Sequence, residues 1–228
     1  MRITLIVLTA ALWAGCGGDG ITSNPGGGTK TLRVQAEAEW DPRLNAAQLE
    51  VDVEKADQDI ANALVTIHSD LGDVTLVYDA GRQQRYYGQQ AGWAAQGYEV
   101  SVVVKDAAGN TTDELSGSVR AAAPVKVSAP DMLKPFDPHT LEGGVLVLKW
   151  GGPAGDTARV RTRRFEPADF APDPMQVSIP AINLTRTDQE LEIRRNTAVI
   201  LAGGAPDSHF TTTWRLETSF IIINPFPE

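Results

Sequence analysis

The sequence holds a single cysteine, Cys16, among its 228 residues. One cysteine cannot form an intramolecular disulfide, so each domain must be held together by its apolar core. Long hydrophobic runs are also scarce. The uncharged apolar run over residues 3–13 has 11 residues, whereas a helix needs roughly 20 to cross a bilayer. The fold therefore depends neither on a disulfide within the chain nor on a membrane-spanning helix over residues 3–13.

The sequence has fewer basic than acidic residues, with 20 Lys and Arg against 29 Asp and Glu, and its formal net charge is −9. An acidic chain repels phosphate backbones, so no nucleic-acid partner is expected. The excess of acidic residues is unevenly distributed along the chain. Residues 31–123 hold seven basic and fifteen acidic side chains, whereas residues 124–228 hold eleven basic and thirteen acidic side chains. This asymmetry, in a chain of this length, indicates two small structural units.

Motifs that carry chemistry are missing as well. The histidines His68, His139 and His209 lie far apart, with no metal-ligand spacing among them. No G-x-S-x-G nucleophile elbow occurs. Carboxylates are so abundant that a pair at glycosidase spacing would carry no information. We therefore predict that the protein is not an enzyme, that it needs no cofactor and that a hydrolase is the least favoured alternative.

The N-terminus has the layout of an export signal. Met1 and Arg2 give a short positive segment, and the apolar run over residues 3–13 follows it. A Gly-rich stretch comes next, where a first strand or helix would have continued the apolar pattern. Such a segment is removed from the mature protein and is excluded from the reasoning about the fold.

The end of this segment resembles the bacterial lipoprotein signal. Ala14, Gly15 and Cys16 match its cleavage box, while Trp13 stands where the family has Leu, and Leu12 lies one place earlier. The resemblance implies cleavage before Cys16, a diacylglyceryl thioether on its sulfur and a further acyl chain, such as palmitate, on its amine. Two or more chains anchor a protein stably to a membrane. Gly17, in place of the Asp that retains lipoproteins at the inner membrane, implies the outer membrane. The alternative is ordinary signal cleavage near Cys16.

We divide the chain into four parts on these grounds: a signal peptide (1–15), a lipidated cysteine with a Gly-rich tether (16–30), a first β-sandwich (31–122) and a second β-sandwich (123–228). The tether has too little apolar surface to fold and would reach roughly 20 Å as a flexible chain. Ala121-Ala122-Ala123-Pro124 reads as the junction between the sandwiches.

The body of the chain has the period of two that is typical of half-buried strands. In the first half this alternation predicts strands near residues 32–38, 49–53, 63–67, 74–78, 98–104 and 115–119, with residues 83–96 as a loop or short strand. In the second half it predicts strands near 125–127, 144–150, 158–165, 176–179, 190–193, 198–201 and 209–223. Turn residues separate them at the spacing of a sandwich. The predicted fold is all-β, with two tandem antiparallel β-sandwiches.

Two segments carry resemblances to known families. Gly97-Tyr98 followed by an alternating strand and Gly109-Asn110 resembles the late strand and turn of bacterial immunoglobulin-like domains. This implies that the Tyr98 ring is packed and its hydroxyl bonded to backbone. An apolar strand ending in Trp150, then a Gly-Pro turn and a second strand, resembles the opening hairpin of fibronectin type III-like domains and implies that Trp150 belongs to the core.

Three groups of side chains are candidate binding sites. Tyr86, Tyr87 and Trp93 could stack on a sugar if exposed, or belong to the core if buried. Arg159, Arg161 and Arg163 would share one strand face and could bind an anion such as a sugar acid or a lipid phosphate, meet the acidic first domain, or simply be solvated. An acidic group could form a weak calcium site or a solvated face that resists edge pairing: Glu50, Asp52, Glu54, Asp57 and Asp59.

These observations favour a cell-envelope lipoprotein with a structural or protein-binding role. The alternative is a carbohydrate- or ligand-binding surface module. The expected partners are the membrane, through the lipid, and envelope proteins or glycans.

Overall fold

The computed structural model describes residues 31–166 and 169–227. The expected signal peptide, Cys16 and the tether lie outside the described residues. The described chain is built from strands joined by turns and three short 3-10 segments, η1 (Pro138–Thr140), η2 (Glu142–Gly144) and η3 (Ala181–Asn183). Within this part, no helix has the length and apolar character needed to span a membrane. The all-β prediction is confirmed.

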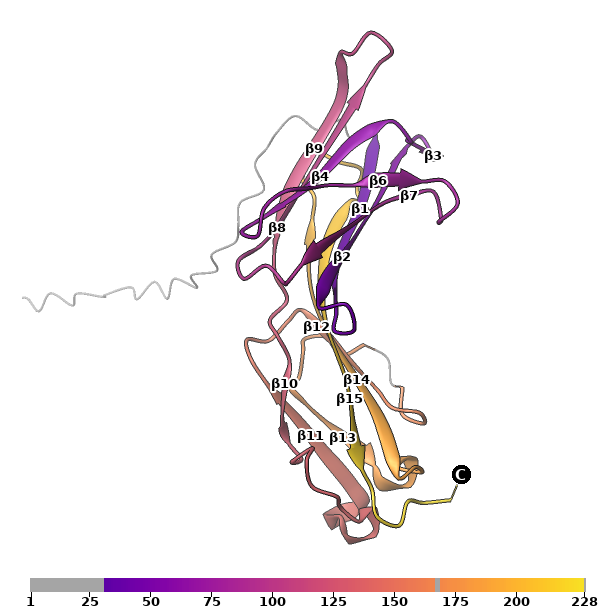
Figure 1. Cartoon of the computed structure of the whole chain (residues 1–228), viewed down its shortest axis with the longest axis vertical. Helices are drawn as coiled ribbons and strands as arrows, with labels where there is room; N and C mark the ends of the chain where they lie inside the picture. Colours follow the sequence, from indigo (N-terminus) through magenta and orange to yellow (C-terminus); the bar gives the residue numbers. More distant parts are fainter. Residues whose placement is uncertain (1–30, 167–168, 228) are drawn as a thin grey trace, which may run out of the picture.

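One large sheet runs the length of the molecule, and two smaller sheets cover it (Figure 1). The large sheet has the order β12 (Thr157–Arg161), β14 (Asp188–Ile200), β15 (His209–Ile221), β1 (Leu32–Asp41), β2 (Ala46–Lys55), β7 (Arg85–Ala91) and β6 (Val77–Asp79), and β3 (Gln58–Asp59) adds to β2. One small sheet has the order β5 (Val74–Thr75), β4 (Ala63–Ser69), β8 (Gly97–Lys105) and β9 (Thr111–Arg120). The other has the order β10 (Lys126–Ala129), β11 (Val145–Gly151) and β13 (Gln176–Pro180).

The large sheet contains one parallel pair of strands, which corrects the prediction of wholly antiparallel sandwiches. Strand β1 pairs with β15 in parallel, from Gln35 opposite His209 to Glu39 opposite Thr213. A hairpin forces its two strands to run antiparallel, but β1 and β15 lie at opposite ends of the described chain and are free of that constraint. Local alternation predicts strands without predicting which distant strand becomes the neighbour.

Two apolar cores lie between the sheets. The first lobe packs β1, β2 and β7 against β4, β8 and β9, and its core includes Leu49, Ile67 and Val102. The second packs β12, β14 and β15 against β10, β11 and β13 around Leu148, Trp150 and other residues. Trp150 is 2% exposed, as the fibronectin type III-like pattern implied.

Tyr98 occupies the corner position implied by the immunoglobulin-like pattern. Its ring is 2% exposed, and its hydroxyl oxygen accepts a hydrogen bond of 3.0 Å from the Ala94 N–H. Burial is the main reason that the pKa of Tyr98 is raised to about 12. The expected strand and its anchoring hydroxyl are both present.

The β14–β15 hairpin belongs to both lobes, and Figure 1 shows its strands passing from one to the other. Leu191 and Phe220 lie in the second core, whereas Leu201 and Phe210 lie in the first. The division drawn at residues 122 and 123 gave the whole hairpin to the second sandwich. The structure instead places its tip among the core residues of the first, because the first residues of β15, His209 to Thr213, pair with β1.

A buried ion pair lies where the lobes meet. Arg195 and Asp173 have side chains that are 0% exposed, and Arg195 Nε lies 2.6 Å from Asp173 Oδ2. The guanidinium also donates to the carbonyl oxygens of Ala123 and Gly151, each at 3.2 Å. One side chain of the hairpin thus ties together the chain segment between the lobes and the end of β11.

Some predicted strands have other limits in the structure. Strand β14 joins the two strands expected at 190–193 and 198–201, and β7 lies inside the uncertain segment 83–96. The strand expected at 74–78 is divided at Leu76, so that β5 joins a small sheet and β6 joins the large one. Strand β12 ends at Arg161, well before the expected end at Phe165, because the chain turns there and the Thr162 N–H bonds to the Phe165 carbonyl.

Candidate functional site

The three aromatic candidates lie in three different surroundings. Tyr86 is 2% exposed in the first core, and its hydroxyl donates to the Ile60 carbonyl at 2.6 Å. Tyr87, its neighbour in β7, is half-buried on the other face, with Arg82 lying 4.3 Å above its ring centre. Trp93 is half-buried and lies near the junction of the lobes, where its indole N–H donates to the Ala122 carbonyl. The structure does not bring these residues together as one stacking platform.

Trp93 belongs to an aromatic cluster that the sequence did not indicate. Trp40 and Trp214 stack with centroids 4.9 Å apart, and the Trp93 ring meets both edge-on, at 6.4 Å and 5.7 Å. These tryptophans come from β1, from β15 and from the turn that follows β7. Their meeting depends on the parallel pairing of β1 with β15, which has no local sequence signal. The cluster explains Trp93 as a packing residue between the lobes.

The predicted arginines are divided by the end of strand β12. Arg159 and Arg161 alternate with the buried Val160 and lie on the outer face of the large sheet, while Arg163 follows the strand in a turn. Arg159 Nε is 2.7 Å from Asp169 Oδ1, and Arg161 Nε is 3.4 Å from Glu166 Oε2. Both of these ion pairs join residues that lie close in sequence. Arg161 and Arg163 line one groove, which does not include Arg159.

Ion pairs between β15 and the first lobe involve arginines other than the three candidates. Arg215 of β15 has its Nη1 3.2 Å from Glu39 Oε1 and its Nη2 3.5 Å from Asp41 Oδ1. Arg43, in the turn between β1 and β2, lies 2.8 Å from Glu217. These ion pairs run along the β1–β15 contact, whereas Arg159 and Arg161 pair with Asp169 and Glu166 of the second lobe.

Arg161 and Arg163 share their groove with two further arginines, Arg43 and Arg186. The groove lies on the outer face of the large sheet in the second lobe and has a volume of about 510 Å³. We call it the arginine groove; its remaining lining residues are Thr162, Glu190, Leu191, Glu192, Glu217 and Thr218. Sequence reasoning missed Arg43 and Arg186 because each lies in a turn that only the folded sheet brings beside β12.

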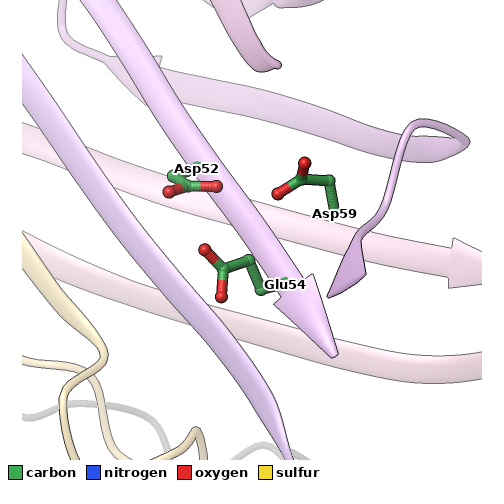
Figure 2. A group of neighbouring side chains, drawn as sticks. All are labelled: Asp52, Glu54 and Asp59. Carbon is green, nitrogen blue, oxygen red and sulfur yellow. The ribbon is translucent and has the colours of Figure 1, made fainter. Parts of the chain in front are cut away.

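The acidic candidates are partly gathered, as Figure 2 shows. Asp52 and Glu54 project from β2 and Asp59 from the adjoining β3, with carboxylate oxygens all within 4.8 Å of one another. Oxygens at this spacing could share one calcium ion, whose ligands lie at about 2.3–2.6 Å. Two guanidiniums already lie against the group, however: Arg33 pairs with Glu54, and Arg85 Nε lies 3.8 Å from Asp52 Oδ2.

Within this group, Asp52 has an environment that disfavours its ionised form. Burial is the main reason that its pKa is raised above the ordinary value, and the charge of Glu54 adds to the shift, while Arg85 opposes it. Its Oδ1 is buried without a hydrogen-bond partner among the described residues. Glu50 lies farther along β2 and pairs with Arg85, and Asp57 is exposed in the turn before β3. The arrangement is an acidic face compensated by arginine.

The histidines are placed separately. The His68 Nδ1 lies 2.8 Å from Asp73 Oδ1, His139 packs against Phe226 with centroids 4.1 Å apart, and His209 contacts the Asp207 carbonyl. They come from β4, η1 and β15 and share no site.

No protein-family model matches the chain, and no curated protein matches it. Solved structures similar to it include part of a 1.5-MDa bacterial ice-binding adhesin, with 16% identity, a TM-score of 0.28 and coverage of 87% of this chain and 66% of that chain, just under two thirds of its length. Fibronectin(III)-like modules of Clostridium thermocellum CbhA show 11% identity, a TM-score of 0.26 and coverage of 84% and 94%. A segment of two fibronectin type III domains from chicken tenascin shows 12% identity and a TM-score of 0.25. The match covers 80% of this chain and 97% of that chain. At these TM-scores and identities the similarities assign no family, ligand or partner to this chain.

Proposed function

We propose that the chain is a non-enzymatic lipoprotein of the cell envelope, anchored through Cys16, whose two lobes form a rigid spacer that holds a binding surface away from the membrane. The observation that carries this proposal is the β14–β15 hairpin, which contributes side chains to both cores. Tandem domains joined only by a linker move relative to each other by default. A hairpin shared by both lobes opposes that motion.

The energetics of the shared hairpin support a stiff molecule. Each of its strands has 13 residues and spans roughly 40 Å at the usual rise of a strand. Bending between the lobes would disrupt the ladder that pairs Asp188 with Ile221 at one end and Ile200 with His209 at the other. It would also expose the Arg195–Asp173 ion pair, whose geometry is satisfied only when the lobes are in place.

The anchor part of the proposal is supported by the Ala14-Gly15-Cys16 motif, and the outer membrane by Gly17. Intact mass of protein purified from the membranes of its native host tests the anchor directly. The expected mass is that of residues 16–228 plus acyl chains, absent from a Cys16→Ala variant. A soluble protein whose mass contains no lipid would refute the anchor and leave the spacer proposal to be judged separately.

The spacer part is tested by distances between spin labels in the Cys16→Ala background, which has no other cysteine. One label replaces the exposed Ala107 of the first lobe and the other replaces the exposed Ser178 of the second. We expect one narrow distance distribution, as narrow as that of a control pair within the first lobe, Ala107→Cys with Gln89→Cys. A broad or multiple distribution between lobes, beside a narrow control, would refute the rigid spacer.

A further inference from the structure

The arginine groove has the features of a ligand site and is not explained by the spacer. Its four guanidiniums come from separate places in the chain: Arg43 from the β1–β2 turn, Arg161 and Arg163 from the end of β12, and Arg186 from the segment before β14. All four residues are exposed. Three glutamates share the lining with these four arginines and offset part of their positive charge.

The floor of the groove is a row of side chains across three strands. Arg161 of β12 stands opposite Glu192 of β14, which stands opposite Glu217 of β15. The two carboxylates are already held, Glu192 by Arg194 at 2.6 Å and Glu217 by Arg43 at 2.8 Å. Each carboxylate of the floor therefore has a guanidinium partner beside it.

The lining thus offers donors and acceptors in one hollow. Arginine supplies only donors, in a planar fork that matches a carboxylate, whereas glutamate supplies only acceptors and threonine supplies both. Four arginines and three glutamates leave one net positive charge on the lining. A bare dianion such as phosphate would meet the guanidiniums but be repelled by the floor. A ligand with one carboxylate and several hydroxyls matches both sets of groups.

We propose that the arginine groove binds the uronic-acid units of an acidic glycan, with guanidiniums on the sugar carboxylate and the floor carboxylates accepting from the sugar hydroxyls. The volume of about 510 Å³ falls within the range of small-molecule sites, roughly 300–1,000 Å³. The Arg161–Glu166 pair does not block the site, because both side chains are more than half exposed, at 55% and 53%, and such pairs are weak.

An anionic bilayer fits this surface less well. A bilayer presents a plane, so it would also face the acidic part of the same sheet face, where Glu39, Asp41 and Glu50 lie on β1 and β2. Acids that come within about one Debye length of the bilayer, roughly 8 Å at physiological salt, would repel its anionic headgroups. A single sugar unit enters the groove without meeting them.

The probe is an oligogalacturonate, titrated into the protein by calorimetry, beside its fully methyl-esterified form, which keeps the hydroxyls and loses the charge. We expect saturable binding of the acid form only. In the double variant Arg161→Gln with Arg163→Gln the affinity should fall roughly tenfold or more, since charge-assisted hydrogen bonds are lost. The matched control is Arg159→Gln, which removes an arginine from the same strand face but outside the groove and should bind as the wild type does.

Three results would overturn the proposal. The first is equal binding of the acid and ester forms, and the second is an equal effect of the Arg159→Gln control. The third is no binding of the oligogalacturonate, whether or not inorganic phosphate or vesicles of anionic lipid bind instead. Unchanged thermal unfolding of the variants shows that any loss arises at the groove. The test uses the mature chain and is independent of the lipid anchor, so failure of the spacer proposal leaves it intact.

Discussion

The ion pair between Arg195 and Asp173 offers the sharpest test of how the lobes are held together. Asp173 accepts from four donors: Arg195 Nε at 2.6 Å, the Met175 N–H at 2.8 Å, the Trp150 indole N–H at 3.2 Å and the Gly155 N–H at 3.3 Å. The change Asp173→Ala leaves a buried guanidinium without its counter-charge and three N–H groups without an acceptor. Breaking a buried pair from one side costs about 3–5 kcal/mol.

The opposite change, Arg195→Met, should cost less. It leaves the carboxylate of Asp173 with its three N–H donors and fills most of the volume of the arginine with an apolar chain. It also leaves the carbonyls of Ala123 and Gly151 without this donor, a smaller penalty than an unpaired buried charge. We therefore expect both variants to be destabilised and Asp173→Ala to be the more destabilised of the two.

Urea unfolding followed by fluorescence and circular dichroism measures the difference. With a slope of about 2–3 kcal/mol per molar, the Asp173→Ala midpoint should fall by about 1–2 M. The control is Asp169→Ala, which breaks the Arg159–Asp169 pair, whose side chains are 43% and 45% exposed; such a pair is worth about 0–1 kcal/mol. A loss below about 1 kcal/mol for Asp173→Ala, or a greater loss for Arg195→Met, would refute this account of the junction.

Three further outcomes follow from single side chains. Tyr98→Phe should lose about 1 kcal/mol in urea unfolding, because the Ala94 N–H loses its acceptor; no loss would mean that the corner bond is dispensable. Phe210→Ala should cost about 3–5 kcal/mol and lower one shared unfolding transition, whereas two separate transitions would contradict a shared hairpin. Asp52→Asn should raise the melting temperature near pH 7, because burial raises the pKa of Asp52 and its ionisation then costs stability as pH rises. The gain should vanish below about pH 4, where the unfolded-state carboxyl is also protonated, and a gain that grew on acidification would contradict this sign.

The sequence was sufficient for the features that depend on local pattern. Alternation predicted most strands, and the Gly97-Tyr98 pattern predicted both the burial of the Tyr98 ring and the bond of its hydroxyl to backbone. Trp150 was predicted to be core by its place at the end of an apolar strand, and it is. These properties follow from which residues alternate and which turn chemistry flanks them.

What the sequence could not supply depends on pairing over long distances. The parallel contact of β1 with β15 joins residues more than 170 positions apart, and no local period encodes it. The tryptophan cluster and the place of Arg43 in the arginine groove both depend on that contact. For the same reason the aromatic candidates could be found in the sequence but not sorted into core, surface and junction.

The alternation along β14 links the cores to the groove. Its odd-numbered residues, such as Leu191, Ile193 and Val199, face the two cores, while its even-numbered residues, such as Glu192 and Arg194, form the outer face. A slip of one residue in this strand would place charges in both cores and apolar side chains in the groove. The register that both cores enforce therefore also fixes the row of Arg161, Glu192 and Glu217. A rigid spacer and a pre-formed anionic-sugar site would thus rest on the same pairing of strands.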